Sequence, residues 1–301
     1  MKAKMRSARK KWLTVSLFLL PSMLGFTVFL LIPVIISLYL GFTNYSGGFT
    51  LDFIGLDNFY NAIGNHNFRN ALWITVKFAV CSVFFQILLG FCFAVLLNGR
   101  TAANRFYRMI VFLPVILSQV AVSLIFMLIL NPQKGPINSF LISLGLAPRP
   151  WLAGAGSALG TIIAVTIWQS FGYYTVLFLG GLQTINLELY EAAAIDGAGG
   201  WQRIRHVTMP LLSPTTFFAL IISIINAFKV FDQVFIMTGG QWGGGPAGST
   251  TVLVFDIYRN AFQYFKMGYA SAEATILLIF ILIITIIQYR GQNKWVNYDR
   301  L

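Results

Sequence analysis

Six long apolar runs, joined by shorter polar segments, set the pattern of this chain. Each run is about 20 residues or longer, which is the length of α-helix needed to cross about 30 Å of hydrocarbon. The strands of a membrane β-barrel would alternate apolar and polar residues, whereas these runs are continuously apolar. The pattern therefore predicts an all-α integral membrane protein with a bundle of six transmembrane helices. We expect these helices at residues 12–40, 71–97, 109–130, 158–182, 215–237 and 270–289.

The amino-acid composition leads to the same class. Hydrophobic residues make up 57% of the 301 residues and charged residues 10%, whereas soluble domains average about 45–50% and about 25%. A chain with so little polar surface belongs in a bilayer, and we expect one transmembrane domain over residues 1–301. It would comprise a basic tail (1–11), spans one to four (12–182), a long loop (183–213), spans five and six (214–289) and a second tail (290–301).

The first apolar run follows six Lys or Arg residues within eleven positions, as in a secretory signal. The apolar part of a signal extends for about 7–15 residues and ends at small residues suited to cleavage. The run at 12–40 is much longer and ends in Tyr39 and Leu40. We therefore expect an uncleaved first span.

Lys and Arg residues are unevenly divided between the two sides of the predicted bundle. Both tails and every second connection hold 14 of them, and the other connections hold 5. Connections rich in Lys and Arg stay in the cytoplasm, so we expect a multi-pass protein of the cell membrane with both termini cytoplasmic. This division also accounts for the net charge of +12 without a nucleic-acid partner, which would need a concentrated basic surface.

The sequence offers no constellation for catalysis or for a cofactor. His66 and His206 fall on opposite sides of the predicted membrane, so they cannot share a metal ion. The glycine-rich stretch at 239–246 lacks the Lys-Ser or Lys-Thr of a phosphate-binding loop. We expect no metal, no cofactor and no covalent catalysis in this chain, so any ATP chemistry would belong to another chain.

The loop at 183–213 has the features of folded structure. Asn186 is placed to cap a short helix that runs to about Asp196. Glycines then interrupt the backbone, a second short helix is expected at 201–207, and Pro210 is expected at the entry to span five.

The first of these short helices has a face with little bulk. Glu191 and Ile195 share this face, and alanines occupy the positions between them. A partner could therefore approach closely. From the spacing alone, the alternative is that this helix merely caps its own bundle.

The same loop carries a recognisable motif. Glu191-Ala192-Ala193 is followed by Gly197 at the required offset, within Asp196-Gly197-Ala198, and then by Val207, Met209 and Pro210. This segment resembles the cytoplasmic loop of permease subunits of ATP-binding-cassette (ABC) importers, with Val and Met in place of the usual Ile and Leu. The resemblance implies a coupling helix that docks on a cytoplasmic ATPase. The residues that it assigns to this contact are Glu191, Ala192, Ala193, Asp196, Gly197 and Pro210.

Two further stretches narrow the resemblance. Residues 33–45 and 54–59 look like the opening of the first permease in sugar importers of the maltose, lactose and glycerol-phosphate type, and residues 228–240 look like its fifth-span ending. Gln241 and Trp242 separate that ending from the usual Gly-Gly-Gly-Pro. The resemblance implies the fold of a type I ABC importer permease. It also implies the partners: a second homologous permease, two ABC ATPases that bind ATP and Mg²⁺, an extracytoplasmic solute-binding protein and a sugar substrate.

Polar residues within spans four and five are candidates for the transport path. A charge at the middle of a span costs about 2.5–3.5 kcal/mol, so such residues usually face the bundle or a wet cavity. Lys229 and Asp232 are three positions apart in span five, on one face of the expected helix. They would either line the path or form a structural ion pair, and both interpretations stay open.

Sugars need groups that pair with hydroxyls, and flat apolar faces on which to stack. Gln169 and Tyr173 share a face of span four, and the resemblance places substrate contacts in spans four and five. Tyr173 or Tyr174 could instead simply pack between helices. The candidate path residues are Gln169, Ser170, Tyr173, Ser223, Asn226, Lys229 and Asp232.

Together these features predict the permease half of an ATP-driven importer for a sugar, an oligosaccharide or a related polyol. The alternative is an ATPase-independent channel or ion-coupled transporter that uses Lys229 and Asp232, which leaves the motif around Glu191 unexplained. A membrane-embedded enzyme would need acids or histidines clustered at one membrane face, and the nine acidic residues are scattered.

Overall fold

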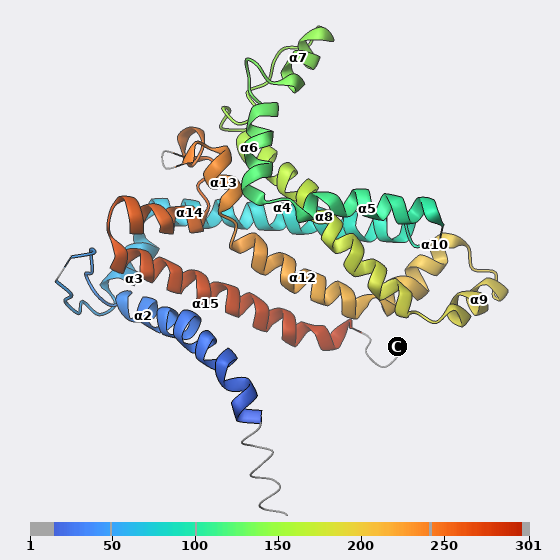
Figure 1. Cartoon of the computed structure of the whole chain (residues 1–301), viewed down its shortest axis with the longest axis horizontal. Helices are drawn as coiled ribbons and strands as arrows, with labels where there is room; N and C mark the ends of the chain where they lie inside the picture. The colour runs from blue at the N-terminus through green and yellow to red at the C-terminus, as the bar shows by residue number, and fades with distance from the viewer. Residues whose placement is uncertain (1–14, 49, 100, 241–242, 297–301) are drawn as a thin grey trace, which may run out of the picture. The chain divides into compact units, whose positions relative to one another are not determined.

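The computed structural model describes residues 15–48, 50–99, 101–240 and 243–296 (Figure 1). The basic tail expected at 1–11, residues 297–301 of the second tail, and Gln241 and Trp242 lie outside the described residues. Over the described residues the regular structure is helical, apart from an isolated antiparallel bridge between Thr43 and Phe53. The prediction of an all-α membrane protein is confirmed.

Four helices are long and apolar enough to cross a bilayer by themselves. They are Val15–Leu40, α4 (His66–Leu96), α8 (Ala158–Thr184) and Met267–Lys294, which contains α15 (Met267–Gly291). Two more spans are bent pairs: α5 (Ala102–Ile116) with α6 (Gln119–Ile129), at 95°, and Gly200–Leu211 with α12 (Ser213–Phe228), at 67°. The described chain thus has six candidate spans if each bent pair crosses once.

The prediction of one uninterrupted helix for the third span, at 109–130, is wrong. Pro114 lies inside the last turn of α5, where it provides no backbone N–H for the helix. Leu117 then adopts an extended conformation (ψ 142°), as does Ser118 (ψ 132°). These two residues turn the chain sharply before α6 begins.

The prediction of one uninterrupted helix for the fifth span, at 215–237, is also wrong. Helix α12 ends at Phe228, and α13 (Asp232–Met237) begins only after Phe231, whose φ and ψ of −144° and −58° are not helical. The two helices are therefore separate elements.

The entry to span five also differs from the expectation. Pro210 lies within a helical segment formed by α10 (Gly200–Arg203), the π-turn η2 (Ile204–Thr208) and α11 (Met209–Leu211). This segment contains the short helix expected at 201–207 and extends it to Leu211. Pro can occupy an early position of a helical turn because the first N–H groups have no intrahelical acceptor. The span itself begins three residues later, at Ser213, where Pro214 occupies the first turn of α12.

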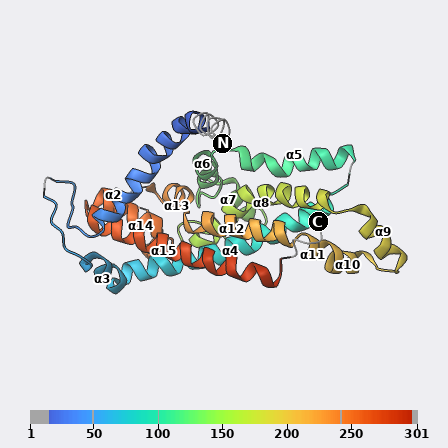
Figure 2. The ribbon, with the colours of Figure 1, turned by 90° about the horizontal axis from the view of Figure 1, so that it is seen from below.

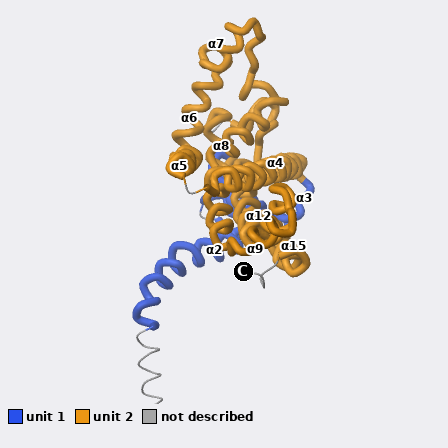
Figure 3. Tube along the Cα trace, turned by 90° about the vertical axis from the view of Figure 1, so that its right-hand side faces the viewer, with its two compact units in different colours: residues 1–64, 260–276 blue, residues 65–259, 277–301 orange. Residues whose placement is uncertain are grey.

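The chain divides into two compact units (Figure 3). One contains the described residues up to Gly64 together with 260–276. Within it, Asn58 donates from Nδ2 to the carbonyl oxygens of Gly41 (3.0 Å) and Thr43 (2.7 Å). The most apolar 18-residue window of its helix Val15–Leu40 contains no buried residue.

The other unit contains residues 65–259 and the described part of 277–301. Its centre is the contact among α4, α8 and α12 (Figure 2). Gly90 of α4 permits the close approach to α8, because a Cβ atom there would lie 2.6 Å from the Cβ of Tyr174. Phe178 and Leu212, both at most 1% exposed, fill the core beside this contact.

We predict that Gly90→Ala destabilises this unit by about 1–3 kcal/mol, because the added methyl group overpacks the contact between α4 and α8. Gly160→Ala is the matched control, since nothing lies within 4 Å of that position in α8. The control should be neutral or more stable by up to about 1 kcal/mol, as alanine favours helix. Thermal unfolding in detergent measures both variants, and equal melting temperatures would contradict the close packing.

Candidate functional site

A cavity of about 630 Å³ lies among α4, α8, α12 and the two helix breaks. All seven residues predicted for the transport path line it, although they come from different elements. Their location together is thus a property of the fold, while their role in transport stays a prediction. Sequence reasoning did not assign five polar residues of the lining to the path: Gln86, Gln119, Thr166, Tyr174 and Gln233.

The two helix breaks form part of the cavity wall. Leu117 lies at the break between α5 and α6, and Lys229, Val230 and Phe231 connect α12 to α13. The carbonyl oxygen of Leu117 accepts a hydrogen bond from Gln169 Nε2 at 3.1 Å. A span that loses helical hydrogen bonds at membrane depth needs such partners, because lipid supplies none.

Gln86 joins the three principal helices at the cavity. It projects from α4, and its Nε2 donates to Ser170 Oγ of α8 at 2.8 Å. Its Oε1 accepts from Ser223 Oγ of α12 at 2.9 Å. The one sequence signal for this residue is an amide side chain in the middle of an apolar run.

The cavity lining contains both buried and exposed side chains. Gln169 is 5% exposed and Ser223 is 1% exposed. In contrast, Tyr173 is 37% exposed, and Asn226 and Lys229 are also exposed. The described chain therefore does not enclose this cavity by itself, and Tyr173 is one of its exposed lining residues.

Lys229 and Asp232 do not share a helical face. Lys229 is the C-terminal cap of α12, and Asp232 opens α13. An ion pair does form between Arg259 and Asp256, at 2.8 Å. A structural pair of Lys229 with Asp232 is thus not formed, because the helix that would align them ends at Phe228.

Helix α9 (Leu187–Ile195) carries the predicted ATPase contact. Asn186 caps it, its Oδ1 accepting from the Glu188 N–H at 3.1 Å, as expected. The helix ends in a glycine cap: the Ala198 N–H reaches the Ala193 carbonyl at 2.9 Å, and Gly197 has a φ of +79°. This cap requires a residue in the left-handed backbone conformation, which glycine adopts without strain. The cap therefore explains why the motif has glycine at position 197.

Most of the motif is accessible on α9. Glu191, Ala192, Asp196 and Gly197 are exposed and Ala193 is half-buried, while Ile195 is 87% exposed. No residue of α9 is buried, although the half-buried Tyr190 packs against the core of this unit. The Tyr190 hydroxyl also joins α9 to the segment after it, through Thr208 Oγ1 at 3.0 Å. Pro210, in that segment, is half-buried.

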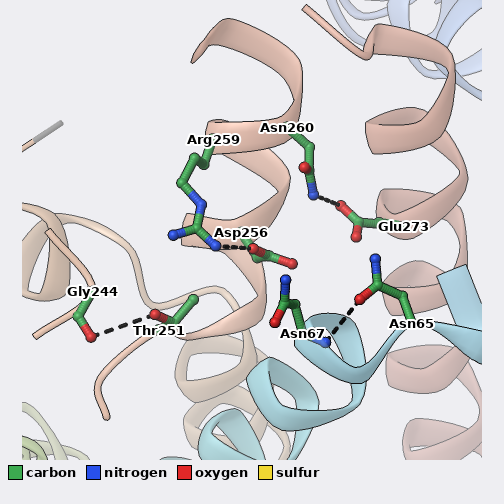
Figure 4. Close-up of polar contacts among 8 residues, drawn as sticks. All are labelled: Asn65, Asn67, Gly244, Thr251, Asp256, Arg259, Asn260 and Glu273. Carbon is green, nitrogen blue, oxygen red and sulfur yellow. Dashed lines mark hydrogen bonds and ion pairs between the residues drawn. The ribbon is translucent and has the colours of Figure 1, made fainter. Parts of the chain in front are cut away.

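Buried acids also occur away from the cavity (Figure 4). In one unit, Asp256 is 2% exposed and pairs with Arg259. Burial raises the pKa of the Asp256 carboxyl, and the charge of Arg259 partly offsets this shift. In the other unit, Glu273 is fully buried and its Oε2 accepts from Asn260 Nδ2 at 2.9 Å.

Comparison with known families identifies a long match. The family described as "Binding-protein-dependent transport system inner membrane component" matches residues 86–297. The chain is 35% identical to the probable ABC transporter permease protein YesP of Bacillus subtilis, over 98% of this chain and 96% of that protein. It is 32% identical to the arabinooligosaccharides transport system permease protein AraP of the same species (91% and 87% covered). It is 29% identical to the sn-glycerol-3-phosphate transport system permease protein UgpA of Salmonella typhimurium (97% of each).

Solved structures agree with these relatives. A bacterial ABC transporter involved in the import of the acidic polysaccharide alginate contains a chain that superposes with a TM-score of 0.86 at 25% identity. The superposition covers 98% of this chain and 100% of that one. The same kind of transporter in complex with its alginate-bound periplasmic protein gives a TM-score of 0.84 at 26% identity, with 96% of each chain covered.

We predict that the free-energy effects of Lys229→Met and Asp232→Asn add, with a coupling below about 0.5 kcal/mol, because the two side chains form no ion pair. The matched control is Arg259→Met with Asp256→Asn, where a buried pair at 2.8 Å should give a coupling above about 1 kcal/mol. Double-mutant cycles of unfolding in detergent provide both numbers. A coupling energy between Lys229 and Asp232 as large as that of the control would show that these two side chains do form an ion pair.

Proposed function

This chain belongs to the family of binding-protein-dependent transport system inner membrane components, and from that premise we propose that it forms half of the path through which an ATP-driven importer moves a sugar, an oligosaccharide or a related polyol. It is a multi-pass permease subunit, a transport component and not an enzyme. The observation that carries the proposal is the cavity among α4, α8 and α12, in a unit that also presents α9.

The chemistry of the cavity suits a hydroxyl-rich ligand. Amide and hydroxyl groups of Gln86, Ser170 and Asn226 can pair with sugar hydroxyls, and the ring of Tyr173 offers a stacking face. Relatives are named for arabinooligosaccharides and for sn-glycerol-3-phosphate, and a solved neighbour imports alginate. These names support a carbohydrate or polyol substrate for this chain.

The path needs a second wall. Tyr173, Asn226 and Lys229 are exposed at the open side of the cavity. A second, homologous permease placed against this side would complete the path and remove these side chains from lipid. An extracytoplasmic binding protein would deliver the sugar to the assembled pair.

Energy would enter through α9. We place α9 and both chain termini in the cytoplasm, as the distribution of Lys and Arg predicts. Two ABC ATPases, which bind ATP and Mg²⁺, would hold the helix with Glu191 as the charged contact and with Ala192, Ala193 and Gly197 allowing close approach. Asp196 and Pro210, the other motif residues, would support this contact by ending α9 and by shaping the turn into span five. Closure of the ATPases would then shift the spans between inward-open and outward-open packings.

An ATPase-independent channel or ion-coupled transporter is the second candidate. It would use Lys229 and Asp232 as a coupled pair, and these residues lie in separate elements without an ion pair. It also gives no role to the exposed α9. The importer accounts for both the cavity and α9.

The experiment that tests the proposal is uptake by the assembled transporter. The chain would be expressed with and without its chromosomal neighbours, purified, and reconstituted into liposomes with its binding protein and candidate sugars. We expect sugar uptake that depends on ATP and on the ATPase subunits. Uptake by the purified chain alone, or failure to retain any ATPase, would exclude the importer.

We predict that Glu191→Arg abolishes co-purification of the ATPase and reduces uptake at least tenfold, because a bulky cation replaces the charged contact on an otherwise small face. The fold should be retained, since the Glu191 side chain is exposed. Gln183→Arg is the control: it adds a positive charge at an exposed position in the last turn of α8, outside α9. Unchanged uptake in Glu191→Arg would remove Glu191 from the mechanism.

A further inference from the structure

A chain of hydrogen bonds with a fixed direction runs along the cavity wall. It starts at the backbone carbonyl of Thr166 in α8, which can only accept. The Ser170 hydroxyl donates its single proton to that carbonyl. Ser170 Oγ must therefore act as acceptor toward its other partner, Gln86.

This anchor determines the orientation of the Gln86 amide. The group that faces Ser170 at 2.8 Å has to donate, so it is the amide nitrogen Nε2. The oxygen Oε1 then faces Ser223, and the Ser223 hydroxyl donates its proton to it at 2.9 Å. The direction thus follows from the Thr166 carbonyl, even though amide oxygen and nitrogen atoms have the same shape.

Both serine protons are consequently committed within the wall. Toward any further group, Ser170 and Ser223 offer only lone pairs. Tyr174 also interacts with Ser223 from α8, which leaves Ser170, the less buried of the two serines, as the more accessible acceptor. A ligand group that meets it has to donate a hydrogen bond.

The charges around the cavity also give no preference for an anionic ligand. Among the described lining residues, the charged side chains are Lys229 and Asp232, one cation and one anion. The lining therefore has no net charge to attract an anionic ligand. A carboxylate or phosphate group is ionised at neutral pH and can only accept, so it would meet the serine lone pairs without a proton between them.

We propose that Gln86 is a positioning residue that, together with the Thr166 carbonyl, holds the hydroxyls of Ser170 and Ser223 as hydrogen-bond acceptors, and that the cavity thereby selects an uncharged, hydroxyl-donating sugar over its carboxylated counterpart. This inference rests on the proposed function and deepens it by naming the substrate class. The hydroxymethyl group of a neutral sugar donates to Ser170, and the carboxylate that replaces this group in a uronate cannot donate.

The test compares paired sugars in the complete importer, reconstituted with its ATPases and with saturating binding protein. The probes are di- and trisaccharides of glucose, galactose and arabinose, with oligoglucuronate and oligogalacturonate as acidic counterparts. The wild type should take up a neutral sugar at least tenfold faster than the acidic ones. Equal or faster uptake of a uronate would overturn the inference while leaving the importer intact, whereas uptake of neither class would overturn the proposed function itself.

Variants at Gln86 test the positioning role. In Gln86→Met the Ser223 hydroxyl loses its acceptor and is free to rotate and to donate, while Ser170 keeps only its bond to the Thr166 carbonyl, so uptake of the neutral sugar should fall about fivefold or more. The preference for neutral over acidic sugars should narrow to less than about threefold. The binding protein is the same in every assay, so a change in preference reports the permease. Gln288→Met is the matched control: it also replaces an amide in a span, but in α15 and away from the cavity lining.

A purely structural role for Gln86 would lower both uptake rates equally and leave the preference unchanged, which would contradict the inference. If Gln86→Met does not assemble with the ATPases, Ser170→Ala decides the question. That variant retains the bond between Gln86 and Ser223 and removes only the accessible acceptor. It should lower neutral-sugar uptake about tenfold with assembly intact, and unchanged uptake would overturn the inference.

Discussion

The need to satisfy backbone polar groups in a medium without water governs this structure. A helix satisfies its own N–H and C=O groups, so a break at membrane depth is tolerated only where protein or a wet cavity takes over. Two spans of this chain break, after Ile116 and after Phe228, and residues of both breaks line the same cavity. Gln169 supplies the missing donor at Leu117. The cavity and the breaks are therefore one feature, since each is possible only with the other.

The same helices that form the cavity also extend to the proposed ATPase contact. Helix α8 runs without interruption from Gln169 to Thr184, and α9 follows after Asn186, roughly 26 Å along the chain axis from Gln169. Helix α12 runs back from Ser213, beside α11, to the break at Lys229. In Figures 1 and 2, α9 and α10 lie together beyond the ends of α8 and α12. A displacement of α9 and α10 can thus reach two walls of the cavity through continuous helices, with Gln86 of α4 bonded to both.

The sequence was sufficient for the spans, the cap at Asn186 and the end of α9 near Asp196, because these features depend on local periodicity and on side chains two to five residues apart. It did not reveal the two breaks, since each is only two or three residues long and contains a single polar residue, Ser118 or Lys229, which changes the mean hydropathy of a span little. Gln86 was missed because its partners lie 84 and 137 positions away. The candidate path residues of spans four and five were chosen from residue type and spacing, and they line one cavity. The ion pair considered for Lys229 and Asp232 does not form, because the helix that would align them ends at Phe228.

The central claim is that the transported sugar passes through the cavity among α4, α8 and α12. Its most direct test is the rate at which a membrane-permeant thiol reagent modifies Asn226→Cys, in a chain whose exposed Cys81 and Cys92 have been replaced by alanine. In the assembled importer, with binding protein and ATP, we expect the transported sugar to slow modification at position 226 at least threefold and to leave an exposed cysteine introduced at Gln183 unaffected. Equal rates at position 226 with and without the sugar, during measurable uptake, would contradict this path.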